Sequence, residues 1–509
     1  MSSSSYGPEE AFLALGSHTH LALYLTVAMV LTVFLISASY TQIIELFPSG
    51  GGGYLVATKL LGTTPGVISG GALVVDYVLT IAISVASGVD AIYSFLPASM
   101  SGSKLAAELV VVGGLTALNL RGIKESVAVL MPIFIAFVVT HFALILWGIG
   151  IHIHDFGSLF AATVQDTHAA SNELGMFGLI GLFLTAYSLG GGTFTGIEAV
   201  SNSTAILREP RVETGKKTMA YMAISLAFTA GGILLCYLLN SVAHEHGRTL
   251  NASLWTLLTK DWMIGGFAVG GPIVVFTLLA EGALLFVAAQ TGFLAGPATL
   301  AAMAVDNWVP KRFAHLSERL VTQNGIITMG LAAIVTLAYT GGAVKLLVVM
   351  YSINVFLTFT LSQLGMVRHW WQVRKTEGHW RRRILLAGLG TLVTGGILVT
   401  TAVIKFTQGG WITLVVTGAF IGLCMLVRSH YLRVRGVLKS LDDVLSDLPM
   451  PDREKEPELA PDGPTAIVLV EAYAGLGIHT LLTVQRMFPR HFKNLVFVSV
   501  GLVDSGQFK

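Results

Sequence analysis

The chain has 509 residues, of which 53% are hydrophobic and 12% charged, and its mean hydropathy is +0.73. Soluble globular domains carry about a quarter charged residues, so this composition excludes a soluble protein over most of the length. The net charge of +2 says little, because the placement of charges matters more than their sum in a membrane protein. We expect the lipid bilayer as the main partner and no nucleic-acid partner.

Apolar stretches recur between His18 and Arg428, separated by short polar breaks. A helix needs about 20 apolar residues to cross the hydrocarbon, and these stretches are far too long for barrel strands. Residues 1–430 are therefore expected to form an all-α polytopic membrane domain of about 12 transmembrane helices, the first of them incomplete. The predicted helices lie near residues 6–15, 18–47, 65–96, 104–120, 125–151, 174–205, 214–243, 264–303, 324–340, 343–367, 384–405 and 410–428.

Lys and Arg residues gather in alternate loops. If the chain starts in the cytoplasm, the inside loops hold most of them, including those within 208–217, 368–383 and 428–439. The outside positions are Lys104, Arg248, Lys260, Lys345 and Lys405. The positive-inside rule then predicts a multi-pass protein of the inner membrane with a cytoplasmic C-terminus.

The composition changes after the last predicted helix. Residues 431–464 are charged and Pro-rich toward their end, and we interpret them as a cytoplasmic linker. Residues 465–509 predict a small α/β module, with strands at 465–470 and 495–500 around a helix at 480–487. One βαβ unit is too small for a core of its own, so the module either continues further or is completed by a second protomer in a homodimer.

Two glycines, Gly475 and Gly477, follow the first strand of this module. Backbone amides in such a turn could bind the phosphate of a nucleotide at a helix N-terminus. A sterically tight strand-to-helix turn explains the same glycines equally well. Both interpretations stay open.

Two interruptions of helical pattern are visible in the membrane domain, at residues 2–8 (Ser-Ser-Ser-Ser-Tyr-Gly-Pro) and 188–196 (Ser-Leu-Gly-Gly-Gly-Thr-Phe-Thr-Gly). They are five predicted helices apart, as in a five-plus-five inverted repeat with a substrate site at mid-membrane. Close helix packing is the alternative explanation for glycines, but it asks for small residues every fourth position. Three consecutive glycines favour unwinding.

Carboxylates within predicted spans indicate function, because an ionisable group at mid-bilayer costs several kcal/mol. Asp76 is followed at helical spacing by Thr80 and Ser84, with Tyr77 beside it. Glu198 follows the second interruption, and Thr195 precedes it by one helical turn. We predict that these two polar stripes take part in a substrate site.

For the other polar residues in the spans, a structural role explains the sequence as well as a functional role does, or better. Glu108 and Glu281 are isolated in the sequence, and a helix–helix hydrogen bond can satisfy a single Glu. His141 lies on an apolar face, which favours a bonded structural histidine over a proton relay. Cys236 and Cys424 lie within apolar runs and are interpreted as core residues.

Three segments resemble the amino acid-polyamine-organocation (APC) superfamily. They are Phe-Pro-Ser-Gly-Gly-Gly-Gly-Tyr at 47–54, Thr-Gly-Ile-Glu-Ala-Val-Ser-Asn at 195–202 with Glu-Pro-Arg at 209–211, and Asp-Asn-Trp-Val-Pro-Lys-Arg-Phe at 306–313. The resemblance covers nearly the whole chain. It implies the LeuT-like fold and a carrier of amino acids, polyamines or potassium.

Within the superfamily the sequence resembles the KimA-type potassium–proton symporters, whose transmembrane core is joined to a universal-stress-protein-like domain that forms dimers. The resemblance implies a potassium site at Tyr6, Asp76, Tyr77, Thr80, Ser84, Thr195, Glu198 and Tyr351. Potassium and protons would be the transported species, with no cofactor and no transition-metal site. The family's aspartate seven residues before the tyrosine would precede Met1, and the soluble domain is short, so we expect both ends to be trimmed.

These observations lead to proton-coupled potassium uptake as the first hypothesis. The alternative is a proton-coupled amino-acid or polyamine permease, in which the amides of residues 188–192 would hold a carboxylate. A sensor whose membrane part no longer transports is a third hypothesis. The sequence shows no catalytic triad, metal-ligand cluster or Walker-type loop, so an enzyme is not expected.

Overall fold

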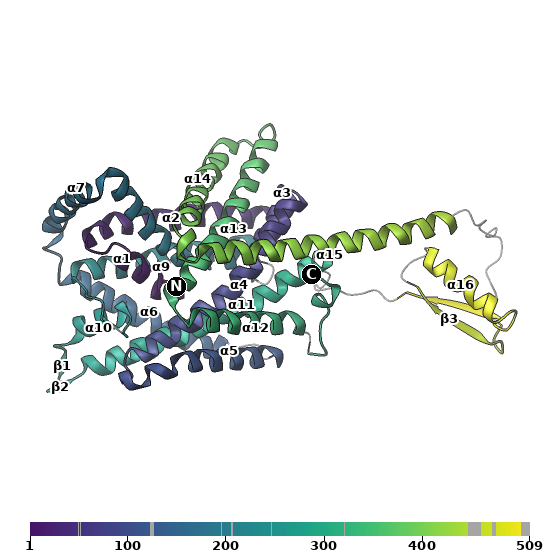
Figure 1. Ribbon diagram of the computed structural model, residues 1–509, viewed down its shortest axis with the longest axis horizontal. Helices are drawn as coiled ribbons and strands as arrows, with labels where there is room; N and C mark the ends of the chain where they lie inside the picture. The colour runs from purple at the N-terminus through teal and green to yellow at the C-terminus, as the bar shows by residue number, and fades with distance from the viewer. Residues whose placement is uncertain are drawn as a thin grey trace. The chain divides into compact units, whose positions relative to one another are not determined.

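The computed structural model describes residues 1–48, 50, 52–122, 127–194, 196–204, 207–245, 247–319, 321–445, 460–470 and 475–499 (Figure 1). The chain forms two compact units. One comprises Met1–Ala301 with Leu316–Ile421, and the other Ala302–His315 with Gly422–Lys509. The first unit contains all the predicted substrate-site residues.

Helices account for nearly all of the described structure up to residue 445. In chain order they are η1 Ser2–Ser5, α1 Gly7–Leu13, η2 Thr19–Leu21, α2 Ala22–Leu46, α3 Gly53–Leu60, α4 Thr63–Tyr93, η3 Ala98–Ser103, α5 Lys104–Leu120, α6 Val127–Gly150, α7 Phe156–Leu189, η4 Gly190–Phe194, α8 Ile197–Asn202, α9 Arg211–Leu239, α10 Leu250–Thr259, α11 Gly270–Val305, η6 Lys311–Phe313, α12 Gln323–Thr340, α13 Val344–Gln372, α14 Trp380–Ile404, η7 Phe406–Gln408 and α15 Gly410–Leu445. Strands β1 Met263–Ile264 and β2 Phe267–Ala268 pair antiparallel before α11.

Ten helices in the described residues are long and apolar enough to cross a membrane. The predicted spans at 6–15 and 324–340 are not among the ten, because α1 has only 7 residues and α12 has 18 with polar residues at its start. A polytopic helical fold is therefore confirmed.

Helix α4 is the most enclosed of the ten, because 89% of its apolar 18-residue stretch is buried inside the protein. It contacts α3, α5, α12 and α13, and α5 and α12 lie side by side in Figure 1. Small residues permit the close approach of its neighbours: a Cβ on Gly88 would lie 2.7 Å from the Phe286 ring of α11. This burial places Asp76 in a protein interior rather than in lipid.

Two helical segments differ from the sequence expectation. Helix α7 begins at Phe156, well before the expected residue 174, and Gly175 interrupts it with φ 74° and ψ 168°. Only glycine adopts such a conformation readily, so the expected start coincides with a kink inside a longer helix. Helix α10 was not predicted; the Thr249 side chain caps it by accepting a 3.2 Å hydrogen bond from the Ala252 N–H.

The second unit contains a βαβ segment, with β3 Thr465–Leu469, α16 Gly475–Met487 and β4 Asn494–Val498. The two strands pair in parallel, from Thr465 opposite Asn494 to Leu469 opposite Val498. Gly475 and Gly477 lie in the first turn of α16, and residues 471–474 of the connecting turn lie outside the described residues. Helix α15 runs to Leu445, so residues 431–445 of the expected linker are helical.

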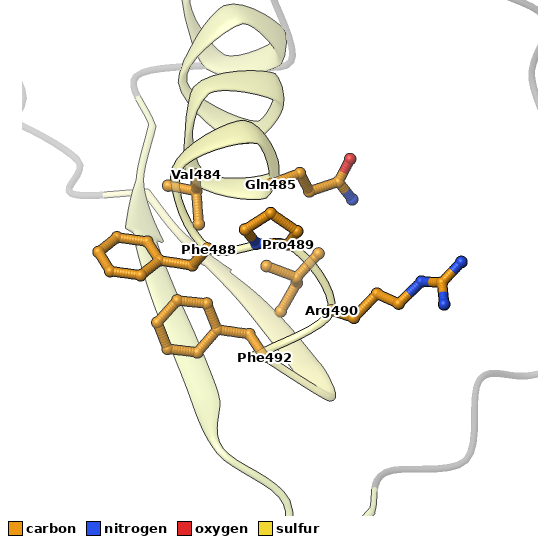
Figure 2. A pocket seen from close by; sticks show the side chains of 7 residues that line it. Val484, Gln485, Phe488, Pro489, Arg490 and Phe492 are labelled. Carbon is orange, nitrogen blue, oxygen red and sulfur yellow. The ribbon is translucent and has the colours of Figure 1, made fainter.

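A shallow pocket lies where α16 ends. It is lined by Val484, Gln485, Phe488, Pro489, Arg490, Phe492 and Leu495. Figure 2 shows the rings of Phe488 and Phe492 next to each other, 5.6 Å between centroids, with Arg490 pointing away from them. None of the predicted site residues lines this pocket.

Candidate functional site

The two predicted helix interruptions exist and lie against each other. The first is η1 followed by α1, and the second is η4 between α7 and α8. The Ser3 hydroxyl donates a 2.9 Å hydrogen bond to the Thr193 carbonyl. A Cβ on Gly7 would lie 2.2 Å from Thr193 Oγ1, and one on Gly192 would lie 2.9 Å from the Tyr6 ring. Glycine at these positions therefore allows both breaks to meet, with Tyr6 buried at their junction.

Glu198 lies in the first turn of α8, where the helix resumes after Gly196 at φ 85°. Its side chain is buried, and Oε1 accepts a 3.0 Å hydrogen bond from the backbone N–H of Gly53 at the start of α3. A helix N-terminus stabilises a negative charge. The predicted partner Thr195 lies outside the described residues.

Asp76 is the second buried carboxylate of the site. It lies in α4 at 7% exposure, and among the described residues its Oδ1 has no hydrogen-bond partner. Glu198 is close enough for the two negative charges to act on each other. Two carboxylates in one enclosed space repel unless a cation or a shared proton lies between them.

Hydroxyl groups surround the two carboxylates. Tyr77 accepts a 2.9 Å hydrogen bond from the Asn202 side chain, and Tyr40 lies near Glu198 and Ser362. A Cβ on Gly53 would lie 3.3 Å from each of the Ser69 and Ser362 hydroxyls. Within the part of the chain that the structure describes, the buried Ser69 hydroxyl has no hydrogen-bond partner, and the Tyr40 and Ser362 hydroxyls lie close enough to interact with each other.

The structure brings Asp76, Tyr77 and Glu198 of the predicted site residues close together. Ser84 and Tyr351 are also buried, in α4 and α13, and Thr80 is partly exposed. The roles of Thr80, Ser84 and Tyr351 in the site stay predictions.

Sequence reasoning missed Tyr40, Ser362 and Asn202. A tyrosine or serine within an apolar helix carries a signal only if its neighbours are known, because hydroxyls in helices commonly bond the carbonyl four residues back. Asn202 belongs to the 195–202 segment quoted above, but its bond to Tyr77 joins residues far apart in the chain.

Glu281, which is isolated in the sequence, makes a hydrogen bond to another helix, one of the two explanations left open above. Its Oε1 accepts a 2.9 Å hydrogen bond from Asn251, and Oε2 lies 3.5 Å from His141 Nε2. Glu108 is different, because both of its buried oxygens are without a hydrogen-bond partner among the described residues.

Comparisons with known proteins identify the family of the chain. Broken helices that meet beside a buried, oxygen-rich site are typical of secondary transporters. The family model for amino acid permeases matches residues 2–431, and the chain belongs to this APC family. The prediction of a transporter that is not an enzyme and works without a cofactor is confirmed by this membership.

One curated relative is the potassium transporter KimA of Bacillus subtilis (strain 168), 31% identical over 449 residues, which cover 87% of this chain and 70% of the relative. Similar solved structures include a manganese transporter of Eremococcus coleocola bound to an aromatic bis-isothiourea compound, with 14% identity and a TM-score of 0.45. The structure of a mutant of that transporter has 13% sequence identity to this chain and a TM-score of 0.44. Each match covers 84% of this chain and 92% of the solved chain.

Proposed function

We propose that this transporter carries potassium ions into the cell in symport with protons. The observation that carries the proposal is the oxygen of Asp76 that has no hydrogen-bond partner among the described residues, buried next to Glu198 and close to hydroxyl groups. Hard cations take oxygen ligands, and one carboxylate is enough to balance the charge of a monovalent ion whose other ligands are neutral oxygens. The name of the KimA relative supports the same ion.

In this proposal Asp76 and Glu198 bind the cation or exchange the coupling proton. Neutral oxygens come from the predicted ligands Tyr6, Tyr77, Thr80, Ser84, Thr195 and Tyr351. Tyr40 and Ser362 join them, since their buried hydroxyls lie beside Glu198.

The arrangement of the whole protein follows from the same proposal. The two breaks would be corresponding parts of a five-plus-five inverted repeat in the cell membrane. The basic loops would place the C-terminus in the cytoplasm. There the α/β module would be a universal-stress-protein-like domain that mediates a homodimer and offers a nucleotide site.

A proton-coupled amino-acid or polyamine permease is the second candidate, because the matching family model describes amino acid permeases. Its carboxylate site would be the glycines of η4. In this conformation their faces are covered: a Cβ on Gly190 would lie 3.0 Å from Met29, and one on Gly191 would lie 2.6 Å from Phe356. That packing favours the oxygen cluster over η4 as the substrate site.

Rubidium uptake into proteoliposomes, with and without an inward proton gradient, tests the proposal. We expect gradient-dependent uptake that unlabelled potassium inhibits and that amino acids and polyamines leave unchanged. Accumulation of a labelled amino acid or polyamine without rubidium uptake would establish the permease instead.

A further inference from the structure

A second buried ionisable cluster lies outside the proposed ion site. It joins His141 of α6, Glu281 of α11 and Asn251 of α10, whose side chains are at most 1% exposed. An isolated charge at such a position would be very costly, so the group must be neutral overall or carry a function.

The hydrogen bonds of His141 define how many protons the pair holds. Its Nδ1 lies 3.0 Å from the Phe137 carbonyl, which can only accept, so Nδ1 carries a hydrogen. Nε2 faces Glu281 Oε2 at 3.5 Å. If Nε2 and Oε2 both lacked a proton, two lone pairs would face each other beside a buried negative charge.

One additional proton resolves that conflict. It can reside on Glu281, which then donates toward Nε2, or on Nε2, which then donates toward the carboxylate. Both forms are neutral overall, and both keep the Nδ1 hydrogen bond to Phe137. The pair is therefore built to hold one proton between its two members.

The pair is connected to the first helix break. The Asn251 side-chain amide donates to Glu281 Oε1 at 2.9 Å and to the Ser5 carbonyl at 3.3 Å, while its Oδ1 accepts a 2.5 Å hydrogen bond from Tyr237. Ser5 directly precedes Tyr6 in the chain. A change at Glu281 thus reaches the backbone beside a predicted ion ligand through a single side chain.

Other groups complete the surroundings of the pair. The Phe137 ring stacks on the imidazole with centroids 3.8 Å apart, and Trp255 of α10 meets it edge-on at 5.4 Å. The nearby ionisable groups are Glu9 of α1 and Tyr237 of α9. Glu9 accepts a 3.0 Å hydrogen bond from the Leu250 N–H, so α10 is bonded to α1 as well as to η1.

We propose that His141 and Glu281 hold the coupling proton of the transport cycle, at a site separate from the cation site formed around Asp76 and Glu198. This inference rests on the proposed proton-coupled transport. Gain or loss of the proton changes the strength of Glu281 as a hydrogen-bond acceptor for Asn251. A shift of the Asn251 side chain then alters its hydrogen bond to the Ser5 carbonyl.

The test compares two transport modes of the full chain in proteoliposomes. Rubidium–potassium counterflow at equal pH requires no net proton movement, whereas accumulation driven by a pH gradient does. Glu281→Gln keeps an acceptor for Asn251 and a donor for His141, so it mimics the protonated pair. We expect it to retain counterflow and to lose gradient-driven accumulation by about tenfold or more. His141→Gln should likewise retain counterflow and lose gradient-driven accumulation.

Glu108→Gln is the matched control, since Glu108 is equally buried but in α5, and it should keep both modes. Gradient-driven accumulation by Glu281→Gln at the wild-type level would overturn the inference. If the wild type moves no rubidium but accumulates an amino acid, the potassium proposal fails, and the same comparison with that solute still tests the proton site.

A second measurement does not depend on transport. The infrared difference spectrum of the purified protein between acidic and alkaline pH should contain a carboxyl or imidazole band that both Glu281→Gln and His141→Gln remove. An unchanged spectrum in both variants would contradict a proton shared by the pair.

Discussion

The carboxylate of Glu198 accepts a hydrogen bond of 3.0 Å from the backbone N–H of Gly53. This bond joins the helix that follows the second break to the N-terminus of α3. It fixes one oxygen of Glu198, whose carboxylate also contacts Asn202 and lies near Tyr40 and Asp76. Gly53 is thus expected to position a substrate ligand without binding substrate itself.

Gly53→Ala tests this positioning. The new Cβ would lie 3.2 Å from Glu198 Oε1 and 3.3 Å from the Ser362 hydroxyl, so both groups must shift by a few tenths of an ångström. We expect the initial rate of rubidium uptake to fall about tenfold at an unchanged amount of folded protein. Gly113→Ala in α5 is the control, because nothing lies within 4 Å of its Cβ. Equal uptake by both variants would show that the geometry around Glu198 is not critical.

Asp76→Asn should abolish uptake. The change keeps the size of the side chain but removes the charge that would neutralise a bound cation, and leaving a buried charge unpaired costs a few kcal/mol, or about 100-fold in affinity. Uptake is measured at equal protein, with Asp261→Asn in an exposed turn as the control. Full activity of Asp76→Asn would remove this residue from the site.

The main features of this site could be predicted from the sequence because their signals are local. Helical spacing places Thr80 and Ser84 after Asp76, and a run of three glycines weakens a helix on all of its faces. The pairings of Glu198 with Gly53 and of His141 with Glu281 could not be predicted, since each joins residues from helices far apart in the chain. Nothing in the local pattern around His141 indicates which helix packs against it.

Tyr40→Phe is expected to weaken ion binding while leaving the stability of the fold nearly unchanged. The buried Tyr40 hydroxyl lies beside Ser362, and the loss of one such contact should change the free energy of unfolding by about 1 kcal/mol or less. If this oxygen contacts the ion, the KM for rubidium should rise about tenfold. Thermal melting and uptake kinetics of the same preparation measure both quantities.

Tyr237→Phe is the contrasting variant. Tyr237 donates to Asn251 Oδ1 at 2.5 Å, so its loss leaves a buried acceptor unpaired and should destabilise the protein by about 1–3 kcal/mol. If Tyr40→Phe instead destabilises the fold as strongly and leaves the KM unchanged, the Tyr40 hydroxyl is structural and not a ligand.

Lys405 follows the last residue of α14 and should make stability depend on pH. Its side chain is fully buried, and its Nζ has no hydrogen-bond partner among the described residues. Burial lowers the pKa of Lys405 to about 7, the charge of Glu10 partly opposes this, and Lys345 adds to it. An unfolded lysine keeps its proton up to about pH 10, so between about pH 7 and 10 the unfolded chain binds more protons than the folded one. The free energy of unfolding should therefore rise with pH across this window and be lowest below it.

Lys405→Met removes the titrating amine and should raise the melting temperature at pH 6, with the gain shrinking toward pH 9. Thermal melts of the purified protein at several pH values measure this, and Lys260→Met, at an exposed lysine, should leave the pH dependence of melting unchanged. If Lys405→Met is less stable than the wild type at pH 6, the charged amine must be well paired in the folded protein, and the attraction to Glu10 outweighs the cost of burial.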